Sequence, residues 1–133
     1  MFDSTKSAAE SQNLPITFYG WRNDVERIMC ASDITILCSD NEGVPLTLIQ
    51  AAQAGLPIVS THVGSVSDIV KHGISGVLVG CSSTELSAAL KELINHEDLR
   101  ISFGAAGKAR ADHFFSSKGM VQAHELFYTQ LIK

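Results

Sequence analysis

The chain has 133 residues, of which 45% are hydrophobic and 18% charged, a balance typical of a folded globular domain and not of a disordered segment. This length suits one domain, because domains cluster at about 100 to 150 residues, and it excludes two complete lobes. The formal net charge is -4, and Lys and Arg form no cluster. The composition therefore argues against nucleic acid or an anionic membrane surface as a partner.

Three cysteines, Cys30, Cys38 and Cys81, lack the paired spacing of a zinc or redox motif, and two of them fall in apolar segments. We expect buried, free thiols in a reducing compartment. No apolar run reaches the ~20 residues of a membrane span, and residues 1–13 lack the basic-then-apolar order of a signal peptide. The sequence predicts a soluble, cytoplasmic protein without a transmembrane segment.

Residues 1–14 are polar with a few alanines, which predicts a helix remnant or a flexible arm before a folded unit at residues 15–133. Short apolar runs rich in Ile and Val follow, and each predicts a strand because it is too short for a helix. These runs are residues 16–19, 34–38, 57–60 and 77–79. Their continuous apolarity favours parallel strands that are covered on both faces.

Helix start and stop signals lie between and after these runs. Asp24 opens one helical pattern, Pro45 fits the first turn of a second that stops at Gly55, and Ser82 with Glu85 forms a capping box before a third. Two further helices are expected, at residues 98–113 and after Ser116 or Ser117. Strands that alternate with helices predict a Rossmann-like, doubly wound α/β sheet.

The most informative stretch for chemistry runs from Ser39 to Leu46 and joins a predicted buried strand to the helix at Pro45. In doubly wound sheets ligands bind beyond the carboxyl ends of the strands, and free amides at a helix start attract phosphate. Gly43 allows a close approach of the backbone. Glu42 would then accept a hydrogen bond from a sugar hydroxyl. Alternatively, Glu42 is a surface carboxylate that the helix dipole favours.

No metal site is expected. Asp40 and Glu42 lie two residues apart and could suggest a metal-diphosphate clamp, but the histidines of the chain show no metal-ligand spacing. The sequence also lacks a Ser, His and Asp set at a nucleophile elbow.

Two segments, ITFYGW at residues 16–21 and ASDITILCSDNEGVPLTLIQAAQAGLPIVSTHVGSVSDIVKHGISGVLV at residues 31–79, closely resemble the carboxyl-terminal lobe of retaining GT-B glycosyltransferases of family 4, also called group 1. The resemblance covers residues 15–133. It implies half of a GT-B fold that binds the donor, and a UDP-, GDP- or ADP-sugar as that donor. It also implies retention of anomeric configuration, and neither a catalytic metal nor another cofactor.

Under this resemblance Glu42 matches the first Glu of the family's Glu-x7-Glu motif, which contacts donor-sugar hydroxyls near the reacting carbon. Glu42 is therefore the candidate catalytic residue. The second Glu, which holds the ribose, falls at Gln50, and the lost charge-assisted hydrogen bond would cost about 1 kcal/mol of donor affinity. The remaining donor-binding candidates form the diphosphate turn and the loop near the base, and they are Gly20, Trp21, Ser39, Gly43, Val44, Pro45 and Leu46. Trp21 has an alternative role in core packing.

Gly64 matches the first glycine of the family's Gly-Gly turn, with Ser65 in place of the second. Family members also carry a Gly-Arg strand, a Lys-Gly turn and an acceptor-binding lobe upstream of the strand at residues 16–19, and the chain has none of these. The resemblance thus implies a transferase that is inactive alone and needs the missing lobe or a partner chain. The truncated sheet is expected to keep about four strands. Either the strand at residues 16–19 lies beside the strand at residues 34–38, or both leave an exposed edge that invites a partner chain or self-association.

Two other readings remain open at this point. One is a stand-alone nucleotide-sugar binding module or a non-catalytic fragment, which would bind the donor without turnover. The other is a small flavodoxin-like regulatory domain, which would bind no sugar nucleotide.

Overall fold

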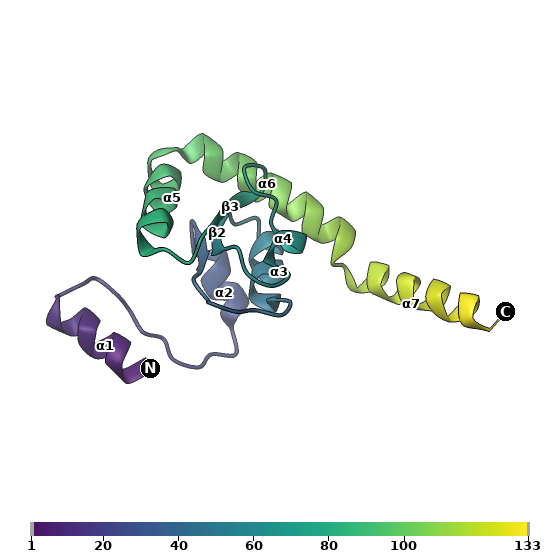
Figure 1. Ribbon diagram of the computed structural model, residues 1–133, viewed down its shortest axis with the longest axis horizontal. Helices are drawn as coiled ribbons and strands as arrows, with labels where there is room; N and C mark the ends of the chain where they lie inside the picture. Colours follow the sequence, from purple (N-terminus) through teal and green to yellow (C-terminus); the bar gives the residue numbers. More distant parts are fainter. Residues whose placement is uncertain (1, 133) are drawn as a thin grey trace.

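The computed structural model describes residues 2–132, so Met1 and Lys133, the outer bounds of the two predicted units, lie outside the described residues. A parallel sheet of three strands in the order β1-β2-β3 forms its centre (Figure 1). The strands are β1 (Thr35–Leu37), β2 (Ile58–Thr61) and β3 (Gly76–Val79). Leu37 pairs with Ser60, and Thr61 with Val79, so all three carboxyl ends meet at one edge of the sheet.

The prediction of a strand at residues 16–19 is wrong, and with it the expectation of about four strands. This segment has no regular secondary structure and belongs to no ladder in the described chain. Ile16 and Tyr19 are 52% and 60% exposed. The physical reason is that β-branched and aromatic residues favour a strand only where a neighbouring strand pairs with them, and here none does.

The described residues form seven helices: α1 (Phe2–Ser11), α2 (Val25–Cys30), α3 (Leu46–Gln53), α4 (Val66–Ile69), α5 (Ser83–Asn95), α6 (Glu97–Phe114) and α7 (Ser117–Leu131). The predicted caps are confirmed at two of them. The Ser82 hydroxyl accepts from the amide of Glu85, and the Ser116 hydroxyl accepts from the amide of Gly119. The Glu85 carboxylate accepts from the amide of Gly80 at 2.8 Å, which ties β3 to the start of α5.

Helices cover both faces of the sheet, as a doubly wound fold requires. On one face, Leu48 of α3, Val66 of α4 and Ala111 of α6 pack around Ile58. On the other face, α5 and the first half of α6 pack around Val59 through a second cluster, formed with Ala89, Leu93 and Phe103. Ile58 and Val59 are consecutive residues of β2, so the strand places one side chain in each core.

Helix α6 binds the carboxyl ends of three other helices through its basic side chains. Arg100 donates to the carbonyls of Leu93 and Ile94 in α5, and Lys108 donates to the carbonyl of Gln53 in α3. Arg110 donates to the main chain of α4. These bonds satisfy carbonyls that a helix end leaves without partners.

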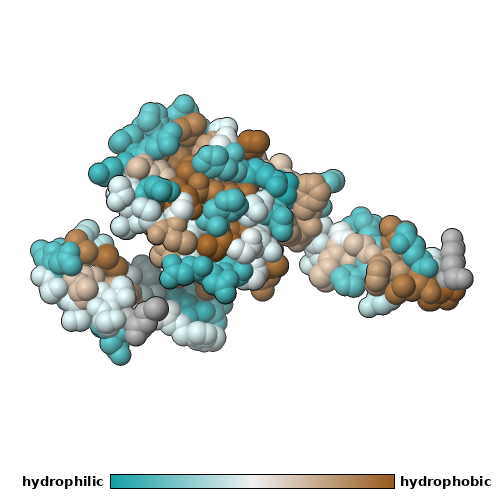
Figure 2. All heavy atoms as spheres, viewed as in Figure 1, coloured by the Kyte–Doolittle hydropathy of each residue, from teal (hydrophilic) through white to brown (hydrophobic). Residues whose placement is uncertain are grey.

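The first and last helices stand away from this body (Figure 1). Helix α7 has no buried residue, and hydrophobic side chains lie along its surface (Figure 2). Its exposed apolar residues are Met120, Val121, Leu126, Phe127, Tyr128 and Leu131.

The prediction of buried thiols is wrong, because Cys30, Cys38 and Cys81 are all exposed and free. Cys30 is the last residue of α2. Cys38 and Cys81 follow the carboxyl ends of β1 and β3, beyond the residues that pack in the core. None of the helices within residues 2–132 is both long enough and apolar enough to cross a membrane.

Candidate functional site

The turn after β1 is held against the turn after β2. Gly64 has a φ of +50° and lies so close to the main chain of Glu42 that a Cβ there would stand 2.8 Å from the Glu42 carbonyl carbon. Next to it, the amide of Ser65 donates to the carbonyl of Gly43 at 3.1 Å. The Thr61 hydroxyl also donates to the carbonyl of Ser39 at 2.6 Å. These contacts fix residues 39–46 at the carboxyl edge of the sheet.

The Glu42 side chain is half-buried in this turn. Among residues 2–132 it makes no ion pair with any Lys, Arg or His, and no side-chain hydrogen bond to it is found. A carboxylate that is half removed from water and lacks a protein donor is available for a donor supplied by a ligand.

Pro45 is the N-cap residue of α3, whose first helical residue is Leu46. The sequence predicts Pro45 within the first turn, so the helix begins one residue later than expected. Pro45 is buried. Val44 and Leu46, on either side, are 57% and 70% exposed. Gly43 is exposed, and nothing lies within 4 Å of a Cβ placed on it. The turn therefore presents its main chain to solvent at the start of a helix, where a positive partial charge develops.

Gln50 lies on α3 and is exposed. It lines a hollow of about 350 Å³ together with Glu26, Met29 and Cys30 of α2. The position that the resemblance assigns to the ribose therefore lines a hollow against α2, and no residue of the turn at residues 39–46 lines that hollow.

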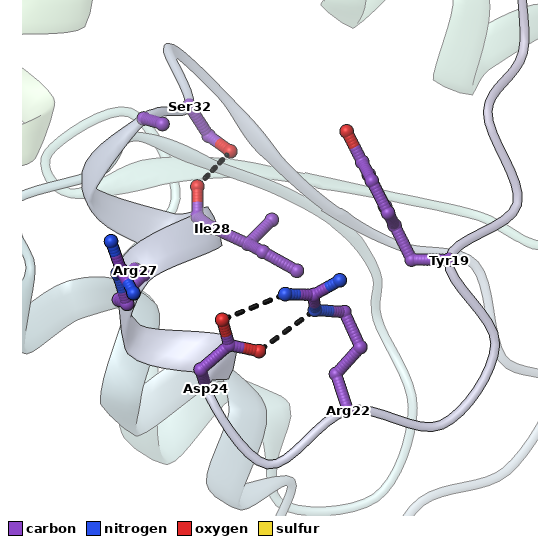
Figure 3. A pocket seen from close by; sticks show the side chains of 7 residues that line it. Tyr19, Arg22, Asp24, Arg27, Ile28 and Ser32 are labelled. Carbon is purple, nitrogen blue, oxygen red and sulfur yellow. Dashed lines mark hydrogen bonds and ion pairs between the residues drawn. The ribbon is translucent and has the colours of Figure 1, made fainter.

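The loop at Gly20 and Trp21 leads into α2. Trp21 is 90% exposed, so its alternative role in core packing is wrong. A hollow of about 480 Å³ is lined by Trp21 together with Tyr19, Arg22 and Arg27. An adjoining hollow of about 520 Å³ shares those last three residues (Figure 3). Neither hollow includes Glu42 or Gln50 in its lining, so the predicted donor-binding residues are spread over an open surface.

Arg22 organises this loop. Its Nε and Nη2 atoms donate to the two carboxylate oxygens of Asp24 at 2.8 and 2.7 Å (Figure 3). Its guanidinium carbon also lies 5.6 Å from the centre of the Tyr19 ring, a cation–π contact. The hydrogen bond from Arg22 holds the pKa of the Asp24 carboxyl below its ordinary value. A planar, charged donor is thereby fixed beside the exposed Trp21.

Sequence reasoning missed Arg22 and Arg27 as members of this surface. The signal available was their position directly after the Gly-Trp pair and at the start of the predicted helix. A further hollow, of about 290 Å³, lies at the carboxyl edge on the α5 side and is lined by Cys38, Asp40 and Thr61 with the first residues of α5. Within residues 2–132 no group of three or more His, Cys, Asp or Glu side chains is placed to hold a metal ion.

Residues 1–110 match the family model of the glycosyl transferases group 1, so the chain belongs to this family. A sequence relative, the D-inositol 3-phosphate glycosyltransferase of Thermobispora bispora, is 31% identical over 104 residues, which are 77% of this chain and 24% of that protein. The N-acetyl-alpha-D-glucosaminyl L-malate synthase of Bacillus anthracis is 27% identical over 120 residues, 89% of this chain and 31% of that protein.

Solved structures show the same fold. The sucrose-phosphate synthase of Thermosynechococcus elongatus superposes with a TM-score of 0.89 at 21% identity, covering 98% of this chain and 34% of that one. Anabaena HepE in complex with UDP-glucose superposes with a TM-score of 0.84 at 21% identity, covering 96% and 36%. A carboxyl-terminal domain of a Francisella tularensis group 1 protein reaches 0.75 at 21% identity, covering 86% and 62%.

The three-stranded sheet and its helices thus correspond to part of the carboxyl-terminal domain of GT-B glycosyltransferases. The chain spans about a third or less of the curated relatives described above, 31% of one and 24% of the other. Family membership sets aside the flavodoxin-like alternative.

Proposed function

We propose that this chain binds the nucleotide diphosphate sugar of a retaining glycosyltransferase at the carboxyl edge of its sheet. The observation that carries the proposal is the packing of Gly64 against the main chain of Glu42. It fixes the turn at residues 39–46 beyond the strand ends, where ligands of doubly wound sheets bind. The exposed main chain before α3 would receive the diphosphate, because helix starts attract anions.

Glu42 would accept hydrogen bonds from hydroxyls of the donor sugar. Its half-buried carboxylate lacks a protein donor in the described chain, and a charge-assisted hydrogen bond to a hydroxyl is worth about 1.5 to 3 kcal/mol. Placed near the reacting carbon, the same carboxylate is the candidate catalytic residue. No metal takes part in this proposal.

The nucleoside would extend across the surface toward α2. Gln50 would contact the ribose, and the Gly20–Trp21 loop would lie near the base, with the exposed indole available for stacking. Anabaena HepE, which has this fold, is known in complex with UDP-glucose, which supports a uridine donor as the first probe. GDP- and ADP-sugars are the alternatives.

Transfer would require more than this chain. Main-chain amides are the groups of this chain that would face the diphosphate. The diphosphate gains negative charge as it leaves during glycosyl transfer, and catalysis must stabilise that charge. We therefore propose that the chain alone is inactive and that an acceptor-binding lobe completes the site. The second candidate is a module that binds the sugar nucleotide without turnover.

Calorimetric titration of UDP-glucose, and then of GDP- and ADP-sugars, tests this function. One of them should bind, and Glu42→Ala should weaken that binding by about tenfold or more. The matched control is Glu125→Ala, which removes an exposed carboxylate from α7. Equal binding by Glu42→Ala would remove Glu42 from the site, and no binding of any sugar nucleotide to the wild-type chain would contradict donor recognition by this chain.

A further inference from the structure

Two free thiols line one hollow at the carboxyl edge of the sheet. The hollow has a volume of about 290 Å³, and its lining includes Cys38 after β1 and Cys81 after β3. Both cysteines are exposed and free. The third cysteine, Cys30, is also exposed and free, but it lines a separate hollow between α2 and α3. The fold therefore brings two of the three thiols to one place.

The main chain fixes the position of each of these two thiols. Cys38 follows β1 directly, and the carbonyl of the next residue accepts a hydrogen bond from the Thr61 hydroxyl at 2.6 Å. Cys81 is the middle residue of a tight turn, in which the Ser82 amide donates to the Gly80 carbonyl at 2.7 Å. Side chains on a fixed main chain lose less conformational freedom when they bind a ligand.

The main-chain segments that carry the two thiols are too far apart for a direct disulfide. Leu37 pairs with Ser60, and Ser60 pairs with Leu78, so β1 and β3 lie two strand spacings apart, about 9.6 Å. A disulfide joins residues whose Cα atoms are at most about 7 Å apart. A bond between the two sulfur atoms would therefore require the main chain to move.

A metal ion between the two sulfur atoms would span this distance. A bond from a thiolate to a metal is about 2.3 Å long, so a linear sulfur–metal–sulfur bridge is about 2.5 Å longer than a disulfide bond. The bridge extends the reach between the two Cα atoms from about 7 to about 9.5 Å. This reach matches the spacing between β1 and β3.

The lining of the hollow selects a soft, monovalent ion. Cu(I) prefers sulfur ligands and is satisfied by two thiolates in a linear arrangement. A structural Zn²⁺ takes four ligands instead. Asp40 also lines the hollow, but within residues 2–132 no group of three or more His, Cys, Asp or Glu side chains is placed to hold a metal ion. The hollow therefore lacks the ligands that Zn²⁺ requires.

Helix α5 begins at the hollow and favours the charge of the bound ion. Two thiolates with one Cu(I) carry one net negative charge, and a helix start carries a positive partial charge. Ser82 and Ser83, which line the hollow, are the N-cap and the first residue of α5. The carboxylate of Asp40 opposes this charge, but Asp40 is exposed, so water and salt screen the repulsion.

We propose that this hollow binds one Cu(I) ion, which is bridged between the Sγ atoms of Cys38 and Cys81. Each thiol releases its proton to solvent as its bond to the metal forms, and the ion keeps its oxidation state. Neither Glu42 nor Gln50 lines the hollow. Binding of Cu(I) is therefore independent of the proposed donor site.

Anaerobic titration of the full chain with Cu(I), held by a coloured Cu(I) chelator, tests the site. The wild type should withdraw one Cu(I) per chain from the chelator, and its sedimentation should not change when the metal is added. Cys38→Ser and Cys81→Ser should each lower the affinity at least about a hundredfold, because losing a residue that merely orients a ligand already costs about 10- to 100-fold. The matched control is Cys30→Ser, which removes an exposed thiol from another hollow and should bind like the wild type.

Alkylation of the wild type gives a second readout that needs no variant. One equivalent of Cu(I) should protect Cys38 and Cys81 from iodoacetamide, whereas Cys30 should react at the same rate with and without the metal. Mass spectrometry of the peptides measures the modification of each cysteine. Circular dichroism of the serine variants shows that a loss of affinity does not come from unfolding.

Four other outcomes would overturn the proposal. The first is a wild type that withdraws no Cu(I) from the chelator. Equal weakening by Cys30→Ser, or protection of all three thiols, would indicate adventitious binding to surface thiols. Half an ion per chain with a doubled mass would place the metal between two chains. A disulfide between Cys38 and Cys81 that forms readily when the metal-free chain is mildly oxidised would contradict the spacing on which the bridge depends.

Discussion

Gly64 packs against the main chain of Glu42 in a backbone conformation, φ +50°, that residues with side chains rarely adopt. This contact joins the turns that follow two adjacent strands, and the bond from the Ser65 amide to the Gly43 carbonyl reinforces it. The position of the Glu42 carboxylate therefore depends on a residue from a different part of the chain. The proposed donor site rests on this relationship.

Replacing Gly64 with alanine should damage both the fold and the site. The added methyl group would collide with the Glu42 carbonyl, which cannot move without moving the turn, and the positive φ adds strain. We expect a loss of about 2 kcal/mol in the free energy of unfolding, measured by urea denaturation, and weaker donor binding. Gly43→Ala is the control, since nothing lies within 4 Å of its Cβ, and it should retain wild-type stability. Equal stability of both variants would show that the turns are not tightly packed.

Gln50→Glu should strengthen donor binding by up to about tenfold, because a carboxylate accepts more strongly from ribose hydroxyls than an amide does. The gain should disappear for a donor analogue that lacks ribose hydroxyls. Gln53→Glu is the matched control, because Gln53 lines the same hollow and carries no predicted role. Calorimetry of the three proteins decides the matter, and a similar gain from Gln53→Glu would indicate a general charge effect instead of ribose recognition.

Arg110 should stabilise the segment that follows Gly64. Its Nη2 donates to the Asp68 carbonyl at 2.6 Å, and its Nε lies 3.2 Å from the carbonyls of Asp68 and Ile69 at the end of α4. Arg110→Ala should cost about 1 to 2 kcal/mol in urea unfolding, and Arg110→Lys should recover part of it. Lys91→Ala, at an exposed position on α5, should change stability by less than about 0.5 kcal/mol. A neutral effect of Arg110→Ala would mean that the α4 end is held by packing alone.

Asp24 should titrate below the ordinary pKa of an aspartate, because its carboxylate accepts two hydrogen bonds from Arg22. A pKa that is lower in the folded than in the unfolded state stabilises the fold at pH above the unfolded pKa. That contribution is lost as the pH falls through the folded pKa. NMR titration of the carboxyl carbon should show the low pKa in the wild type and a rise toward the ordinary value in Arg22→Ala. An unchanged value would show that the pair does not persist in solution.

The sequence predicted correctly those helix ends that are determined by a capping residue or a glycine within a few positions. The hydroxyl caps at Ser82 and Ser116 and the stop of α3 near Gly55, whose φ is +79°, are confirmed because each is decided within a few residues. The runs predicted at residues 34–38, 57–60 and 77–79 overlap the three strands of the sheet, at residues 35–37, 58–61 and 76–79. Helix α4, of four residues, was too short to produce a periodic pattern.

Predictions from the sequence were wrong or missing where the structure of a segment depends on its contacts with other segments of the chain. Residues 16–19 have the composition of a strand, but no strand of the described chain pairs with them, and Cys38 is exposed just beyond the carboxyl end of β1. The contact of Gly64 with Glu42 joins segments more than twenty residues apart in the printed sequence, so only the fold reveals it. The positions of Arg22 and Trp21 around a shared hollow likewise follow from the path of the loop into α2.

Amide chemical shifts of the labelled chain, recorded while UDP-glucose is added, test the central claim most directly. If the turn at residues 39–46 holds the diphosphate and Glu42 holds the sugar, the largest shifts should fall on the amides of Gly43, Val44 and Leu46. The same amides should move little in Glu42→Ala. Shifts confined to the hollow around Arg22 and Arg27, with the amides of the turn unmoved in the wild type, would contradict the account.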